Sequence, residues 1–394
     1  MSNRTSFCRG VKMRLRNTIF VILVCTTNLF AEQKAIVTVP SPALLKEPKY
    51  NFDGSNIVTQ MYRCDTVEIL EQTKEKDKVC GKEDYWYKVK DKSGKEGWLY
   101  GGFLEIIQPN GSSNSSFTNI IRLTDGKNDK GYIAPTFSND GENIVFASSR
   151  SKTYHIWIMD KNGGNLREIS KLSWDMEPIW SPDNKYIVFA SYGPNRNKGV
   201  FNIWTIGVDG TKLSQLTFDE DYNDDNQYPK WSPDGRSIVW SHAKQVWIMD
   251  RDGLNKKLLT SQPAKAYERP ICWSSDSKFI LYSGADTSYG RNPYKPFIIQ
   301  RDGKNQRRIL ENIPSDEYMP PVNVIKYSKD GKFLYLHKEK SILKMDFNEQ
   351  KVVKEILLPV DEVISIDISP DEKCAVFDDS GCEVAGNIYK YNFK

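Results

Sequence analysis

Histidine is scarce in this sequence of 394 residues, which contains only His155, His242 and His337. The sequence also lacks the zinc-protease pattern H-E-x-x-H, the nucleophile pattern G-x-S-x-G and paired cysteines at metal-ligand spacing. These absences argue against a metal-dependent or serine hydrolase, and the sequence predicts neither a cofactor nor a metal site. A glycan hydrolase that uses two carboxylates needs no sequence motif, so that enzyme class stays open as an alternative.

A strong net charge is also lacking once the first 31 residues are set aside. Those residues hold five of the 55 basic residues and no acidic residue, so 50 basic residues face 51 acidic ones in the rest of the chain. A nearly neutral protein exerts no general electrostatic attraction on nucleic acid or anionic lipid. The sequence therefore predicts no nucleic-acid partner.

Long apolar runs are missing too. The run from Thr18 to Cys25 is shorter than the ~20 apolar residues that a transmembrane helix needs. It follows a basic segment and precedes the small residue Ala31, which is the order of a signal peptide. We expect residues 1–31 to be cleaved, and the mature chain to be exported to the periplasm or cell envelope without a membrane span. Acylation of Cys25, which would anchor the protein to lipid, is the alternative, although Val24 is larger than the residue usual before an acylated cysteine.

Cysteines are few, and export would permit disulfides. Two pairs are close in sequence and are candidate disulfides: Cys64 with Cys80, and Cys374 with Cys382. Cys272 stands in an apolar strand pattern, which favours a buried free thiol.

Residues 34–107 contain short runs with strand character, separated by charged turns, and strands at this density are typical of a small barrel. Three motifs in this segment resemble the bacterial SH3-like (SH3b) family: Cys64-Asp-Thr-Val-Glu-Ile-Leu70, Trp86-Tyr-Lys-Val89 and Gly97-Trp-Leu-Tyr100. The resemblance implies a barrel that binds cell-wall peptides or glycans, although the family's N-V-R-x-G-P signature is absent. The candidate groove residues are Tyr85, Trp86, Tyr87, Trp98 and Tyr100. Filling of the barrel core is the alternative role of Trp86 and Trp98, because so small a barrel needs large side chains inside.

A polar linker, residues 108–118, precedes a repeat that occupies residues 119–394. Six segments share the pattern P-x-W-S-P-D-G in whole or in part, at intervals of about 46 residues. Their common aspartates are Asp140, Asp183, Asp234, Asp276, Asp330 and Asp371. Because the aspartate recurs six times in a turn pattern, we assign it to turn formation rather than to catalysis.

Each repeat unit continues with two apolar strands, a tight turn and a short outer strand, so the unit has four strands. Six such units predict a six-bladed β-propeller, and the apolar runs suit inner strands that neighbouring blades cover on both faces. The last unit ends at its third strand, and residues 119–124 have the pattern of the missing fourth. We therefore expect the N-terminal strand to pair with the C-terminal blade and to close the ring. The repeat resembles the WD40-like PD40 repeats of TolB, but the SH3-like segment shows that the chain is not TolB itself.

The long, varied loops of the repeat would lie on one face of such a propeller, together with the mouth of its central channel. Binding residues usually stand on variable loops of a rigid scaffold. The candidate residues for partner binding at the channel mouth are Tyr132, Glu177, Tyr228, Glu268, Arg269, Tyr289, Arg291, Tyr294 and Tyr318. Lining of a water-filled channel is the alternative role of these side chains.

We therefore expect an all-β, non-catalytic protein of the cell envelope, whose propeller is a scaffold for protein–protein interaction. The expected partner is an envelope protein or lipoprotein. One alternative is that the SH3-like domain anchors the chain to peptidoglycan, and another is an envelope glycan hydrolase.

Overall fold

The computed structural model describes most of the chain as β-structure, in two compact units that comprise residues 1–118 and 119–394. The described residues are 9–15, 18–24, 34–37, 42–49, 55–61, 65–79, 82–107, 119–124, 131–194, 199–260, 268–285, 294–310, 323–338, 341–358, 363–379 and 387–393. Within these ranges there is no α-helix, and hence no helix long and apolar enough to cross a membrane.

The first unit contains a seven-stranded antiparallel sheet and two separate hairpins. The sheet has the order β11 (Leu104–Ile107), β3 (Lys34–Val37), β6 (Thr66–Gln72), β9 (Trp86–Lys90), β10 (Glu96–Tyr100), β4 (Ala43–Leu45) and β5 (Ile57–Gln60), with a 3-10 turn η1 (Gly101–Phe103) after β10. The hairpins pair β7 (Asp77–Val79) with β8 (Lys82–Asp84), and β1 (Arg9–Leu15) with β2 (Thr18–Val24). The three SH3-like motifs named above thus supply β6, β9 and β10.

Alternating residues of this sheet form the core of the first unit. Val67, Ile69, Val89 and Leu99 are buried together. Strands β4 and β10 lie so close that a Cβ atom at Gly97 would stand 2.6 Å from Leu44 Cγ. The glycine of the G-W-L-Y motif is therefore required by packing.

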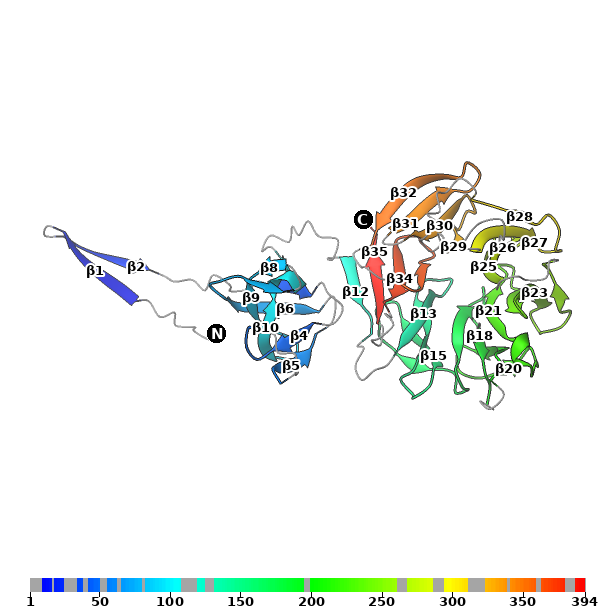
Figure 1. Cartoon of the computed structure of the whole chain (residues 1–394), viewed down its shortest axis with the longest axis horizontal. Coiled ribbons are helices and arrows are strands. Elements are labelled where there is room, and N and C mark those ends of the chain that lie inside the picture. Colours follow the sequence, from blue (N-terminus) through cyan, green and yellow to red (C-terminus); the bar gives the residue numbers. More distant parts are fainter. Residues whose placement is uncertain are drawn as a thin grey trace. The chain divides into compact units, whose positions relative to one another are not determined.

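The described residues of the second unit form six four-stranded antiparallel sheets, which lie around a common centre (Figure 1). Five sheets are continuous in sequence: β13 (Tyr132–Phe137), β14 (Asn143–Ser148), β15 (His155–Asp160) and β16 (Arg167–Glu168); β17 (Met176–Trp180), β18 (Tyr186–Ser191), β19 (Asn202–Gly207) and β20 (Ser214–Gln215); β21 (Asn226–Trp231), β22 (Ser237–His242), β23 (Gln245–Asp250) and β24 (Lys257–Leu258); β25 (Arg269–Trp273), β26 (Phe279–Ala285), β27 (Tyr294–Gln300) and β28 (Arg307–Arg308); β29 (Asn323–Tyr327), β30 (Phe333–Lys338), β31 (Ser341–Asp346) and β32 (Lys351–Leu357). A 3-10 turn, η4 (Tyr222–Asp224), precedes β21.

The sixth sheet joins the two ends of the unit. Its order is β12 (Ile120–Arg122), β35 (Ile388–Asn392), β34 (Cys374–Asp378) and β33 (Ile366–Ile368). Strand β12 pairs with β35 in the antiparallel sense, and Thr124 Oγ1 accepts a hydrogen bond of 2.9 Å from the Ile388 N–H. The predicted pairing of residues 119–124 with the C-terminal strand is therefore present.

Three other sheets contain the same kind of hydrogen bond, from a backbone N–H to a side-chain hydroxyl. Ser170, Thr217 and Thr260 accept hydrogen bonds of 2.7, 2.9 and 3.2 Å from the backbone N–H groups of Ile156, Ile203 and Val246, respectively. Each hydroxyl satisfies a buried backbone donor near the start of a third strand. This contact gives the repeated Leu-Thr of the sequence a physical role, and Thr124 plays it for a strand 264 residues away.

The repeated aspartates form turns, as expected. In all six turns the serine hydroxyl two residues earlier donates to the aspartate, at 2.5 to 2.7 Å: Ser138–Asp140, Ser181–Asp183, Ser232–Asp234, Ser274–Asp276, Ser328–Asp330 and Ser369–Asp371. These hydrogen bonds favour the ionised carboxyl and help to lower the pKa of each aspartate.

The apolar runs of the inner strands are buried because neighbouring sheets cover both of their faces. In β18, Ile187 and Phe189 pack with Val145 of the preceding sheet, whereas Val188 packs with Trp240 of the following one. Burial of each such side chain contributes roughly 1.5–3 kcal/mol. Successive side chains of an inner strand thus contact the preceding and the following sheet in turn, and for this reason the strand does not alternate polar with apolar residues.

One candidate disulfide is not supported. Cys374 has a free thiol at the start of β34, where its side chain packs against a cluster that includes Phe137 and Ile144. Cys272 also has a free thiol, and burial raises its pKa to about 12. Cys25, Cys64, Cys80 and Cys382 lie outside the described residues, as does the predicted linker 108–118.

Candidate functional site

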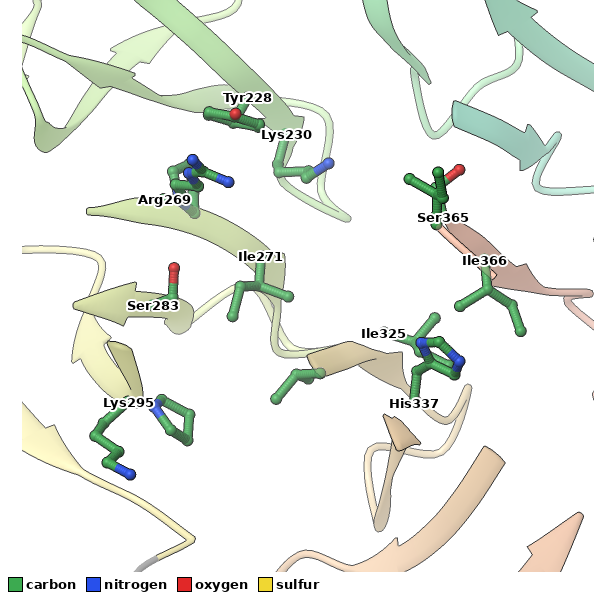
Figure 2. A pocket seen from close by; sticks show the side chains of 14 residues that line it. Tyr228, Lys230, Arg269, Ile271, Ser283, Lys295, Ile325, His337, Ser365 and Ile366 are labelled. Carbon is green, nitrogen blue, oxygen red and sulfur yellow. The ribbon is translucent and has the colours of Figure 1, made fainter. Parts of the chain in front are cut away.

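A cavity of about 310 Å³ opens among four sheets of the second unit, and basic side chains line it. We call it the basic cavity (Figure 2). Its lining residues are Tyr228, Lys230, Arg269, Pro270, Ile271, Ser283, Lys295, Pro296, Val324, Ile325, His337, Ile364, Ser365 and Ile366. Two residues predicted for the channel mouth, Tyr228 and Arg269, are therefore brought together here.

Tyr228 and Arg269 contact each other directly. The guanidinium carbon of Arg269 lies 4.7 Å from the centroid of the Tyr228 ring, a cation–π distance. Tyr228 has a positive φ of 56° next to a bulge between β21 and β22, and its backbone N–H donates to Glu177 Oε2 at 2.5 Å. The carboxylate of the preceding sheet therefore holds this uncommon backbone conformation in place.

Glu177 itself supports the cavity without lining it. Burial raises the pKa of its carboxyl to about 7, although Lys230, Arg269 and the Tyr228 N–H act in the opposite direction. Near neutral pH, this group is divided between its charged and neutral forms. Its contact with the Tyr228 backbone indicates a positioning role rather than direct contact with a partner.

Lys230 is the basic residue that sequence reasoning missed. Its side chain extends into the cavity from the same side as Tyr228 and Arg269, facing Ser365 (Figure 2). Burial lowers the pKa of its ammonium group. In the part of the chain that the structure describes, no hydrogen bond or ion pair engages its Nζ atom.

A second cavity, of about 250 Å³, shares Lys230, Ile271, Ile325 and Ile366 with the basic cavity. One repeat position supplies a residue from every sheet to its lining, namely the position before the last residue of the first strand. These residues are Thr136, Ile179, Lys230, Cys272, Lys326 and Asp367. In the sequence, Lys230 is the variable residue of the P-x-W-S pattern, and the pattern alone does not mark that position as part of a cavity.

Charges at this repeat position are paired in one case. Lys326 Nζ lies 2.7 Å from Asp367 Oδ1, and Asp367 Oδ2 also accepts the Phe137 N–H at 2.9 Å. Lys230 has Ile179 and Cys272 at the equivalent places of its neighbouring sheets. Its two immediate neighbours at this repeat position are therefore not carboxylates, and the carboxyls that act on Lys230 through space are those of Glu177 and Asp367.

The other predicted residues of the channel mouth lie elsewhere. Tyr132 is fully buried against Phe146, and Glu268 is buried and does not line the basic cavity. Burial raises the pKa of the Glu268 carboxyl. Tyr294 is the first residue of β27, and Tyr289, Arg291 and Tyr318 lie outside the described residues.

The aromatic residues predicted for the SH3-like groove divide into two groups. Trp86, Tyr87 and Tyr100 are buried in the first unit, where Trp86 Nε1 donates to Asp77 Oδ2 and the Tyr100 hydroxyl to the Asp77 carbonyl oxygen. Tyr85 and Trp98 are only partly buried. Of the five, these two present surface to a ligand.

Two family profiles match the chain. The TolB beta propeller domain matches residues 121–320, slightly more than half of the 394 residues, and the bacterial SH3 domain matches residues 53–105. The seven-stranded sheet of the first unit and the six four-stranded sheets of the second agree with these two assignments in order along the chain.

Characterised and uncharacterised relatives are distant. The Tol-Pal system protein TolB of Francisella tularensis subsp. mediasiatica is 20% identical over 276 residues, which cover 59% of this chain and 61% of that protein. The uncharacterized peptidase YuxL of Bacillus subtilis is 29% identical over 224 residues, or 55% of this chain and 29% of that protein. The chain thus spans less than two thirds of the length of either relative.

Matches to solved structures have low sequence identity. A gluconolactonase from Xanthomonas campestris superposes with a TM-score of 0.50 and 11% identity, covering 70% of this chain and 89% of its own. TolB from Acinetobacter baumannii gives a TM-score of 0.46 at 15% identity, covering 80% and 78%. On the match of its repeat region, this chain belongs to the family of the TolB β-propeller domain.

Proposed function

We propose that this chain is an exported, non-catalytic protein of the cell envelope, and that its second unit is a closed six-bladed propeller that docks a protein partner. The basic cavity carries this proposal. Side chains from four sheets converge on it, and Tyr228 and Arg269 at its edge belong to residue types that commonly anchor protein interfaces.

Contacts between the first and last sheets support a closed ring. The Ala134 N–H donates to Asp378 Oδ2 and the Phe137 N–H to Asp367 Oδ2, both at 2.9 Å, so β13 is bound to the sheet that contains β33 and β34. With β12 paired to β35, the sixth sheet combines strands from both ends of the unit. In this arrangement β12 covers the edge of β35 that would otherwise be exposed, so no further strand or helix is needed there.

The lining of the basic cavity supports binding rather than catalysis. Glycan hydrolysis requires two carboxyl groups that flank the scissile bond. No aspartate or glutamate belongs to the described lining, and Asp367 of the second cavity is engaged by Lys326. We therefore expect the purified chain to leave cell-wall polymer intact.

Export and an envelope partner are supported by the signal-peptide pattern of residues 1–31 and by the relative whose name places it in the Tol-Pal system. A photo-crosslinking residue at position 228 of the full chain tests the docking surface in the producing cell. We expect one or a few discrete adducts with envelope proteins. The same residue at position 278, an exposed site in a short turn, is the matched control and should give none; equal labelling at both positions would rule out docking at this cavity.

The first unit favours a second candidate function, that of a peptidoglycan anchor. The match to the bacterial SH3 domain and the part-exposed rings of Tyr85 and Trp98 support it. This function is compatible with docking by the propeller, since the two would belong to separate units.

A further inference from the structure

The basic cavity carries an excess of positive charge. Lys230 and Arg269 come from two different strands, β21 and β25, and the described lining residues include no carboxylate. The nearby carboxyl of Glu177 offsets this charge only in part. Its Oε2 atom accepts the Tyr228 N–H, and burial keeps a large share of the group neutral near pH 7.

Lys230 is the residue that most needs an anionic partner. Lys326, at the same repeat position two sheets further on, has Asp367 at 2.7 Å, whereas nothing in the described residues forms an ion pair or hydrogen bond with Lys230 Nζ. The carboxyls of Glu177 and Asp367 act on this ammonium group through space, but neither contacts it. A partly buried ammonium group without a contacting counter-charge costs free energy. An incoming anion would offset that cost and form a charge-assisted hydrogen bond.

The walls of the cavity indicate what the anion is attached to. Ile271, Val324, Ile325 and Ile366 supply branched aliphatic surface beside the basic groups. A sugar ring would be better served by an open aromatic face and several neutral hydrogen-bonding groups. Among the described lining residues Tyr228 is the only aromatic ring other than His337, and Arg269 already covers it at 4.7 Å. Aliphatic side chains next to a carboxylate are instead a common feature of peptides.

We propose that the basic cavity binds an acidic, aliphatic peptide segment of the partner. A glutamate or aspartate carboxylate would lie between Lys230 and Arg269, which Figure 2 places on the same side of the cavity, and a neighbouring aliphatic side chain would pack on Ile271 and Ile325. This inference rests on the proposed function, in which the propeller docks a protein, and it specifies the chemistry of the docked segment.

The test uses the full chain and a fluorescein-labelled octapeptide in which glutamate and leucine alternate. A second octapeptide has glutamine in place of each glutamate. By fluorescence anisotropy we expect the acidic peptide to bind about tenfold or more tightly than the glutamine peptide. Lys230→Gln and, separately, Arg269→Gln should each remove most of that difference, while Lys278→Gln, the same charge change in an exposed turn, should leave both affinities within about twofold. Arg269 is exposed, so its variant remains informative if Lys230→Gln disturbs folding.

Four outcomes would overturn the inference, and they differ in what they say about docking. Equal binding of the two peptides would reject the proposed contact of a carboxylate with Lys230 and Arg269, and so would acidic-peptide binding that survives both substitutions. In either case the crosslinking experiment at position 228 would still decide whether a protein docks at this cavity. Failure of the acidic peptide to bind at millimolar concentration would reject an acidic segment in the same way. Preferential, Lys230-dependent binding of a galacturonic acid trimer would identify a site for acidic sugar and would count against protein docking as well.

Discussion

At the scale of single residues, the environment of Glu177 combines influences that raise the pKa of its carboxyl with influences that lower it. Burial favours the neutral carboxyl, while the Tyr228 N–H, Lys230 and Arg269 favour the carboxylate, and burial is the largest of these, so the pKa rises from 4.5 to about 7. The negative charge of Asp225 acts in the same direction as burial. Protonation of Glu177 therefore stabilises the folded state.

This environment predicts a pH-dependent stability that Glu177→Gln should abolish. Between pH 4.5 and 7 the folded chain binds more protons at this site than the unfolded chain does, so the contribution of Glu177 to stability falls as the pH rises through that window. The loss is nearly complete by about pH 8 and amounts to roughly 3 kcal/mol. Glutamine keeps an oxygen that accepts the Tyr228 N–H, but it cannot ionise.

Urea unfolding of both proteins at pH 5, 6, 7 and 8 measures this effect. The stability of Glu177→Gln relative to the original chain should increase with pH and level off near pH 8. A difference that stays constant across the series would show that Glu177 has an ordinary pKa in the folded state.

Lys230 illustrates what residue-level reading of the sequence omits. Its place in the P-x-W-S pattern shows that it belongs to the first strand of a repeat, and nothing local distinguishes it from Thr136 or Ile179 at the same position. Only the arrangement of six sheets reveals that this position lines a cavity, and that the paired Lys326 and Asp367 contrast with Lys230. Tyr132 shows the converse, because an aromatic residue at a promising loop position is fully buried.

At the scale of strands and sheets, a side-chain hydroxyl adds to the backbone pairing of β12 with β35. Thr124 Oγ1 accepts the Ile388 N–H at 2.9 Å and donates to Asn387 Oδ1 at 3.2 Å, and Thr124 is 8% exposed. Thr217 makes the same backbone contact, with Ile203, between strands that are close in sequence. The same hydroxyl-to-backbone hydrogen bond therefore occurs in a sheet that is continuous in sequence and in the sheet that joins the two ends of the second unit.

Thr124→Ala should loosen this joint, because the buried Ile388 N–H loses its acceptor at a cost of about 1–3 kcal/mol. Hydrogen exchange followed by mass spectrometry should report faster exchange in the peptide that contains residues 387–393. Thr124→Ser keeps the hydroxyl and should exchange at the original rate. Thr217→Ala is the matched control in an ordinary sheet and should affect the peptide around residue 203 instead. Unchanged exchange at 387–393 in Thr124→Ala would mean that the pairing in the seam does not depend on this contact.

Elements of this protein could be predicted well because their signals repeat. This holds for the serine–aspartate turns, the apolar inner strands and the strand at 119–124. Each pattern recurs in several repeat units, so an assignment made in one unit is supported by the same pattern in the others. The first unit has no repeat, and its sheet of seven strands includes β4, β5 and β11, which were not recognised. Their short, irregular patterns carry little periodic signal, and tertiary contacts such as that of Leu44 with Gly97 define them.

At the scale of the whole molecule, the two units have separate cores. The first unit buries Val67, Ile69 and Leu99 within its own sheet, and the second buries its side chains between successive sheets. Each unit therefore has the packing that independent folding requires. A division of labour, with wall binding in one unit and partner docking in the other, can then be tested by separating them.

Co-sedimentation with purified insoluble peptidoglycan provides that test. We expect chains of residues 32–394 and 32–110 to pellet with the wall and residues 117–394 to stay in solution. In the longest chain, Tyr85→Ala should reduce the pelleted fraction several-fold, because it removes a part-exposed ring at the surface of the first unit. Phe218→Ala, which removes an exposed ring of the second unit, is the control and should pellet as before. If residues 32–110 fold, as their far-ultraviolet circular dichroism and cooperative melting would show, and yet remain in solution, the anchor function falls. Docking by the propeller would then be decided by the crosslinks at position 228 alone, because all the contacts on which the docking proposal rests lie within the second unit.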